Sequence, residues 1–337
     1  MPAEEDENLA NEQFGELNRQ FFASRHGPHV YLTHRICGLV RQASNSEASR
    51  AAAAEGLHLG EVVLTIDRED PMYDEAHLFA ALDATVLLHH ASESLLRLYI
   101  SMLDDEPCPW LATARTRSPG IFKKKVKAAI SSLDAEAGRQ QLSLLLLGHR
   151  SYEASVAIVT RAGGKAVPEE LWDSCLKGGA DLLKHAATVF LEEAPVYNAA
   201  KHGLALLSGE ASVRYGDDDS PIRAQGPSLT YLETIRANSG ERKWAQTTRW
   251  LKPDQAVAET QLLVGTIAKL WTVAQSRYAA MKSEDSVWPV SDELVSSVLE
   301  RRLSARVDEG YSITVPSFSM TLLYYETPSA LVNPHLQ

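Results

Sequence analysis

Residues 74–103 read DEAHLFAALDATVLLHHASESLLRLYISML, and this stretch decides the fold class. Its apolar residues recur every three or four positions from Leu78 to Met102, and neither proline nor glycine interrupts them. The period predicts one long core helix. Helical periodicity returns over 122–158, 169–175 and 181–193, so the sequence predicts a helical bundle for the middle of the chain.

The pattern changes to short extended runs after residue 203. Runs at 211–215, 228–235 and 244–251 are separated by turn-forming residues, which is typical of an antiparallel β-meander. A further long helix is predicted over 253–281, and the runs 311–315 and 319–325 are candidates for edge strands that pair with the meander. The predicted fold class is therefore mainly α (α+β): a helical bundle with a carboxy-terminal antiparallel β-meander and a further long helix.

The amino-terminal part is predicted to hold an amphipathic helix at 8–22 and a strand or extended connector at 61–66. A chain of 337 residues is long enough for one large domain or for two. We expect three parts: the amino-terminal helix and connector at 1–70, the bundle at 71–205, and the meander, long helix and last strands, packed on the bundle, at 206–337.

Charge and cysteine content narrow the classes of protein. The chain has 33 Lys and Arg against 44 Asp and Glu, a net charge of −11, which favours solubility and opposes broad electrostatic capture of nucleic acid or membrane. The net charge does not exclude a local basic patch. The three cysteines are far apart, the first residues resemble no secretory signal, and the longest apolar run near the middle, 142–147, is far shorter than a membrane span. We therefore expect a cytoplasmic protein that does not bind a membrane.

The stretch PVYNAAKHG at 195–203 is the best candidate for chemistry. If a helix begins at its proline, Asn198, Lys201 and His202 share one helical face. An amide, an ammonium and an imidazole together can position a phosphate and move a proton near neutral pH. The alternative is that Asn198 and His202 satisfy buried backbone groups where the bundle meets the sheet.

Two segments resemble the HEPN superfamily, helical bundles named for higher eukaryote and prokaryote nucleotide binding. One is the long helix with HHASESLLRLY at 89–99, and the other is Asn198-x-x-x-His202, which is similar to the second half of the family's Arg-Asn-x-x-x-His motif. The resemblance covers about 75–205. It implies a homodimer and, for many members, a metal-independent ribonuclease. Tyr197 stands where the motif has arginine, so a stabiliser of phosphate charge is missing unless Lys201 or Arg97 replaces it.

A basic stretch lies between the two segments of this resemblance. The sequence predicts a flexible basic loop at 113–120 and a helix after it. Six cations fall within thirteen residues: Arg115, Arg117, Lys123, Lys124, Lys125 and Lys127. They are a candidate site for a phosphate backbone, or else a solvated loop and first helical turn. Few aromatic residues for base stacking are nearby.

Three further patterns are interpreted as coincidental. Residues 74–77 spell the DEAH box of helicases, but no phosphate-binding loop precedes them. His89, His90, Glu93 and His185 lack the paired spacing of a di-iron bundle, and the acidic run 217–219 lacks the pattern of a calcium-binding loop. No metal and no cofactor is expected.

The expected function is a non-catalytic or weakly catalytic HEPN-like protein that binds a nucleotide, RNA or a protein partner, with bacterial stress or defence as its setting. The alternative is a metal-independent endoribonuclease, in which His202 is the general acid or base, Asn198 orients the phosphate and Lys201 offsets its charge. The expected binding residues are Tyr197, Arg97, Lys123, Lys124 and Lys125. Whether the protein is an enzyme is left open by the sequence.

Overall fold

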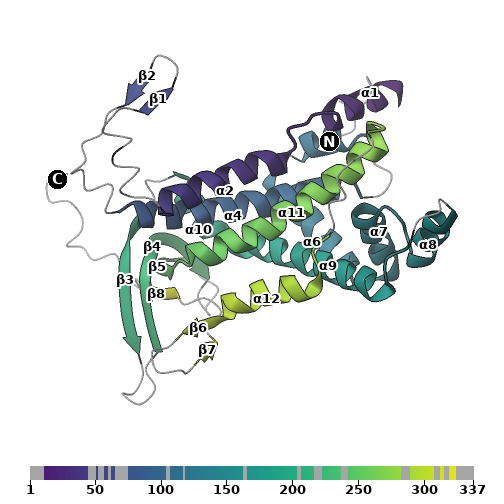
Figure 1. Cartoon of the computed structure of the whole chain (residues 1–337). Coiled ribbons are helices and arrows are strands. Elements are labelled where there is room, and N and C mark those ends of the chain that lie inside the picture. The colour runs from purple at the N-terminus through teal and green to yellow at the C-terminus, as the bar shows by residue number, and fades with distance from the viewer. Residues whose placement is uncertain are drawn as a thin grey trace. The chain divides into compact units, whose positions relative to one another are not determined.

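The computed structural model shows a mainly α-helical protein with an antiparallel sheet, which confirms the predicted fold class (Figure 1). It describes residues 11–44, 51, 57–59, 62–64, 75–103, 107–116, 118–161, 165–202, 206–215, 222–236, 242–281, 289–306, 312–314 and 319–323. The chain divides into two compact units. Unit 1 comprises Met1–Gly38, Leu87–Glu193 and Asp254–Arg301, and unit 2 comprises Leu39–Val86, Ala194–Pro253 and Arg302–Gln337.

Helices build unit 1. They are α1 (Asn11–Phe22), the first part of α2 (Pro28–Ser44), most of α4 (Ala76–Ser101), α5 (Pro109–Arg115), α6 (Pro119–Ser132), α7 (Glu136–Leu147), α8 (Tyr152–Arg161), α9 (Glu169–Glu192), α11 (Pro253–Tyr278) and most of α12 (Asp292–Leu303). The core comes from their apolar stripes, and Leu95, Tyr99, Phe122, Leu182 and Ile267 are each at most 1% exposed. Within the described segments, no helix combines the length and apolar character that crossing a membrane requires.

The two long helices predicted at 74–103 and 253–281 are confirmed as α4 and α11. The helical structure predicted over 122–158 is confirmed, and the chain forms it as three helices, α6, α7 and α8. Gly148 ends α7 with a left-handed φ of 80°, a conformation that glycine adopts without steric cost. The apolar period continues across these breaks, so periodicity alone does not reveal them.

The prediction of a flexible basic loop at 113–120 is wrong for most of these residues. Arg115 ends α5, and α6 begins at Pro119. Both α5 and α6 start with a proline, which fits the first helical position because no backbone N–H is needed there. Arg117 lies outside the described residues. Pro28 likewise begins α2, a helix that the sequence pattern did not predict.

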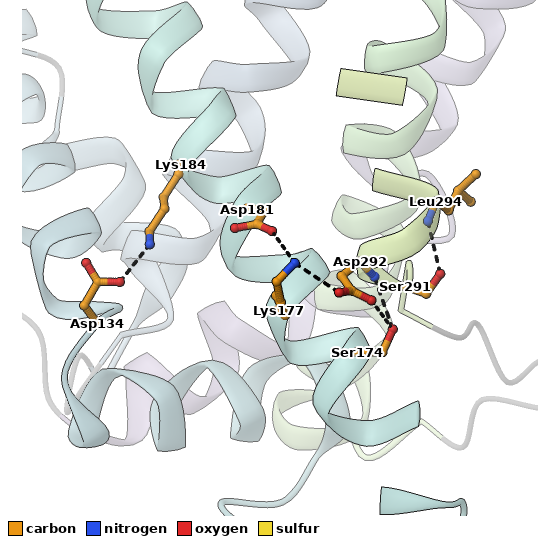
Figure 2. Close-up of polar contacts among 8 residues, drawn as sticks. All are labelled: Asp134, Ser174, Lys177, Asp181, Lys184, Ser291, Asp292 and Leu294. Carbon is orange, nitrogen blue, oxygen red and sulfur yellow. Dashed lines mark hydrogen bonds and ion pairs between the residues drawn. The ribbon is translucent and has the colours of Figure 1, made fainter. Parts of the chain in front are cut away.

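The start of α12 is seated closely on α9, as Figure 2 shows. The Ser174 hydroxyl donates to Asp292 Oδ1 at 2.6 Å, and the backbone N–H of Asp292 donates to the same hydroxyl oxygen at 3.3 Å. Lys177 Nζ lies 3.0 Å from Asp292 Oδ2. These hydrogen bonds, first that of Ser174 and then that of Lys177, lower the pKa of the Asp292 carboxyl. Gly178 completes the contact, because a Cβ there would lie 2.5 Å from the carbonyl oxygen of Val290.

Unit 2 holds the β-structure. Strands β3 (Leu206–Tyr215), β4 (Ile222–Arg236), β5 (Arg242–Trp250) and β8 (Ser319–Leu323) form an antiparallel sheet in the order β3-β4-β5-β8. Two further pairs are β1 (Leu57–Leu59) with β2 (Val62–Leu64), and β6 (Ser304–Arg306) with β7 (Ser312–Thr314). The meander is confirmed and β8 is its predicted edge strand, but the expected pairing of the run at 311–315 with the meander is wrong, because β7 pairs with β6.

One face of the sheet packs against α10 (Ala194–His202). Val196 and Ala199 of this helix form a core with Leu229 and Tyr231 of β4, and partly buried Leu82 and Leu251 pack against it. Leu229 and Tyr231 are two positions apart, so strand geometry places them on the same face. This packing fixes the side of α10 that carries Val196 and Ala199.

Candidate functional site

A cavity of about 370 Å³ lies among α4, α5 and α6 of unit 1. Two of the predicted binding residues, Arg97 of α4 and Lys125 of α6, both line it. Apolar side chains form much of the rest of the wall, among them Ile100, Leu103 and Phe122. Lys125 is exposed, so the cavity opens to solvent on the side of α6. Apolar walls with a few placed polar groups are typical of small-molecule sites of this size.

The guanidinium of Arg97 is held in a fixed orientation. Nε donates to Glu93 Oε1 at 2.8 Å, Nη2 lies 2.7 Å from the same oxygen, and Nη1 donates to the carbonyl of Thr116 at 2.9 Å. The guanidinium carbon also lies 4.2 Å from the centroid of the Phe122 ring, a cation–π contact. Glu93 and Thr116 therefore engage all three nitrogens of the guanidinium, and Glu93 balances part of its charge. Arg97 is a rigid part of the cavity wall.

Three lysines on the first turns of α6 differ in their relation to the cavity. Lys125 shares a helical face with Ala128, Ala129 and Ser132, because residues three, four and seven positions apart lie on one side of a helix, and all four line the cavity. Lys123 and Lys124 are exposed but are not part of its wall. No ion pair joins any of the three to another residue in the described part of the chain. Lys125 is therefore an exposed cation of the cavity wall that no ion pair holds among the described residues.

The second group of predicted residues lies on α10 in unit 2. Asn198 and Lys201 are exposed, whereas Tyr197 is 9% exposed and faces the interior. Lys201 Nζ lies 5.8 Å from the centroid of the Tyr197 ring. His202 is the last residue of α10, and its side chain is outside the described structure. The exposed amide of Asn198 does not fit the alternative that it satisfies buried backbone groups.

The structure thus brings Arg97 together with Lys125, and Tyr197 together with Lys201. These two pairs belong to different units. The histidines considered as metal ligands have other surroundings: His90 Nδ1 lies 3.3 Å from Arg35 Nη1, and His89 is buried against Phe190 at a ring distance of 5.6 Å. Burial lowers the pKa of His89 to about 4, so this imidazole is neutral at physiological pH. In the part of the chain that the structure describes, no three His, Cys, Asp or Glu side chains are grouped to hold a metal.

One buried polar cluster was not predicted from the sequence. His185 Nε2 of α9 lies 2.9 Å from Glu259 Oε2 of α11, and Gln255 Nε2 donates to Glu259 Oε1 at 2.8 Å. Glu259 is 1% exposed. His185 and Glu259 are 74 residues apart, and no motif connects them, so only the packing of the two helices reveals the pair. The cluster ties α9 to α11 within unit 1.

No family model, no curated protein and no solved structure matches this chain. Its function is therefore inferred from the geometry of its own residues.

Proposed function

We propose that this protein is a non-catalytic or weakly catalytic HEPN-like scaffold that binds a phosphate-bearing ligand, a nucleotide or RNA, at the cavity lined by Arg97 and Lys125. The observation that supports this proposal is the presence of two cations from different helices on one largely apolar cavity. Arg97 offers a positively charged guanidinium that Glu93 and Thr116 orient, and Lys125 offers an ammonium on a long flexible side chain that can follow a phosphate. Bacterial stress or defence is the setting that the HEPN resemblance suggests.

The volume and the walls of the cavity agree with a ligand that has an apolar part. A space of about 370 Å³ lies within the range that small-molecule sites occupy. Ile100 and Leu103 supply apolar contact for a base or sugar, while the cations take the phosphate. Lys123 and Lys124, exposed on the same helix, extend the positive charge for a longer polyanion such as RNA.

The test compares two lysines of α6. Binding of a labelled mixed-sequence single-stranded RNA and of nucleoside triphosphates is measured by fluorescence anisotropy or calorimetry for wild type, Lys125→Gln and Lys127→Gln. Lys127 is the matched control, because it is exposed on the same helix but does not line the cavity. Lys125→Gln should weaken binding by about five-fold or more and flatten the RNA salt slope by about 0.7, whereas Lys127→Gln should have little effect. Equal effects of both substitutions would contradict a site in the cavity.

A ribonuclease function is the second candidate. The observation in its favour is that Asn198 and Lys201 are both exposed on α10, three positions apart. In this reaction His202 would transfer the proton, Asn198 would orient the phosphate and Lys201 would offset its charge. Single-stranded RNA is incubated with wild type and with His202→Ala in the presence of a chelator, and the fragment ends are analysed. Cleavage that His202→Ala abolishes supports the enzyme, and no cleavage by either protein supports the scaffold.

We also infer a cytoplasmic homodimer, because HEPN proteins act in pairs. Light scattering coupled to size-exclusion chromatography measures the mass directly against 37.0 kDa for one chain. A monomer at every concentration would contradict this inference. A protein that binds neither RNA nor nucleotides would instead point to a protein partner.

A further inference from the structure

The sheet of unit 2 carries large apolar side chains on the face opposite the α10 core. Leu207 of β3, Leu232 of β4 and Trp244 of β5 are 72%, 63% and 62% exposed. On the other face, by contrast, Leu229 and Ala245 are at most 1% exposed. Three such side chains on three adjacent strands form a patch rather than scattered exposure, and patches of this kind mark binding surfaces.

The strand register arranges these three residues in a diagonal row. Leu207 pairs with Thr230, two positions before Leu232 on β4, and Leu232 pairs with Gln246, two positions after Trp244 on β5. Two strand spacings of about 4.8 Å and four positions of about 3.3 Å give the row a length of about 16 Å. About five stacked nucleotides cover this distance at roughly 3.4 Å each.

The row leads to a pair of arginine positions. Trp244 pairs with Thr234, and two positions further along the same register Arg236 pairs with Arg242. Because positions two apart along a strand belong to one face, both arginine positions are on the face of the sheet that carries Trp244. Two arginine positions at the end of the row match the charge of an anionic ligand.

We propose that this sheet face binds single-stranded nucleic acid, with a base stacked on Trp244 and the phosphate backbone at the Arg236–Arg242 pair. An exposed indole and two arginine positions on the same face would supply both interactions that sequence-tolerant binding of single strands requires, since every base has a stacking face and every nucleotide a phosphate. Leu232 and Leu207 continue the apolar surface for the next nucleotides. The proposal goes beyond the ligand cavity of unit 1 and does not depend on it.

The test uses the full chain and labelled oligonucleotides of about 12 nucleotides, oligouridine and oligothymidine, in fluorescence anisotropy titrations at several salt concentrations. Trp244→Leu keeps an apolar side chain but removes stacking, and should weaken binding by about five-fold or more. Trp244→Phe keeps a stacking ring and should stay within about two-fold of wild type. Equal affinity for RNA and DNA means that bases and phosphates provide the binding energy, and a preference for RNA adds the 2′-hydroxyl.

A charge series tests the second half of the proposal. The double substitution Arg236→Gln with Arg242→Gln should flatten the slope of log affinity against log salt by about 1.4, at roughly 0.7 for each phosphate of a single strand that no longer meets a cation. Lys243→Gln is the matched control, because Lys243 is one position from Arg242 and so belongs to the opposite face. Its slope should equal that of wild type. Circular dichroism verifies that each variant keeps its fold.

Several results would overturn the proposal. These are the absence of wild-type binding at about 50 mM salt, wild-type affinity in Trp244→Leu, and an equal change of slope in Lys243→Gln. Loss of self-association in Trp244→Leu without a change in oligonucleotide affinity would make this face an interface between two copies of the chain. Binding that depends on Lys125 but not on Trp244 would support the cavity of unit 1 alone, and the reverse result would support the sheet alone.

Discussion

Substituting Gly178 by alanine should destabilise unit 1, although helix propensity predicts the opposite. Gly178 lies in the interior of α9, where alanine normally favours the helix by up to about 1 kcal/mol. The added Cβ would lie 2.5 Å from the carbonyl oxygen of Val290 and 2.8 Å from the carbonyl carbon of Ser291. These are backbone atoms, so no side-chain rotation can relieve the clash. The segment that begins α12 must move.

The size of the effect follows from that movement. Ordinary van der Waals separation begins at 3.4 Å, so the carbonyl of Val290 must retreat by about 0.9 Å. A shift of this size in Asp292 would stretch its 2.6 Å hydrogen bond from Ser174 to the limit of hydrogen bonding. Overpacking costs about 1 to 3 kcal/mol in comparable substitutions, and the gain in propensity offsets part of it. We expect a net loss of about 1 to 2 kcal/mol in the free energy of unfolding.

Urea denaturation followed by circular dichroism measures this free energy, with Gly38→Ala as the control. Gly38 is an exposed position of α2 in unit 1, and no atom outside its own helix and chain neighbours lies within 4 Å of the Cβ that alanine would add. Gly38→Ala should therefore stabilise the protein by up to about 1 kcal/mol. If Gly178→Ala is as stable as Gly38→Ala, the close seating of α12 on α9 is refuted.

Three further predictions concern buried groups. His185→Leu removes the imidazole beside the buried Glu259 carboxylate and should lower the free energy of unfolding, measured by urea denaturation, by about 3 kcal/mol. Adding Glu259→Gln should recover much of this loss, and equal stability of the single and double variants would contradict the prediction. His89 has a pKa near 4 in the folded state against 6.5 when unfolded, so its contribution to stability is fully present above pH 6.5 and declines as pH falls towards 4. Urea midpoints should therefore fall less over this range in His89→Gln than in wild type. In the native protein iodoacetamide should alkylate the exposed Cys37 but not Cys175, because Cys175 is 2% exposed and burial raises the pKa of its thiol. Mass spectrometry after digestion measures the reaction of each cysteine, and early alkylation of Cys175 would contradict the prediction.

Elements with long and uninterrupted periodicity were predictable from the sequence, and their ends were not. The helix α4 was predictable because apolar residues dominate its core-facing side over seven turns. Pro28 occupies the first position of α2, and its presence did not reveal this helix because a proline can either begin a helix or interrupt one. The division into α6, α7 and α8 depends on local turns that the continuing apolar pattern hides.

The candidate site was predictable as a set of residue types but not as an arrangement. Arg97 and Lys125 were both selected from the sequence, yet nothing in a separation of 28 residues indicates that they line the same cavity. Glu93 and Thr116, which fix the guanidinium of Arg97, carry no motif. The diagonal row on the sheet depends on register, and a shift of one residue would move each of its side chains to the other face.

The three separate stretches of unit 1 determine when this protein can fold during its synthesis. Gln275 of α11 donates to the carbonyl of Ser24, which precedes it by 251 residues, and Trp271 packs on Phe22 nearby. At about 5 to 20 residues per second, a ribosome needs roughly 10 to 50 s to make the chain between them. For that time the aromatic residues of α1 have no α11 to cover them, so we expect the nascent chain to bind a chaperone until α11 is made. A chain that stops before residue 253 would keep this surface exposed and should be removed by proteases or aggregate.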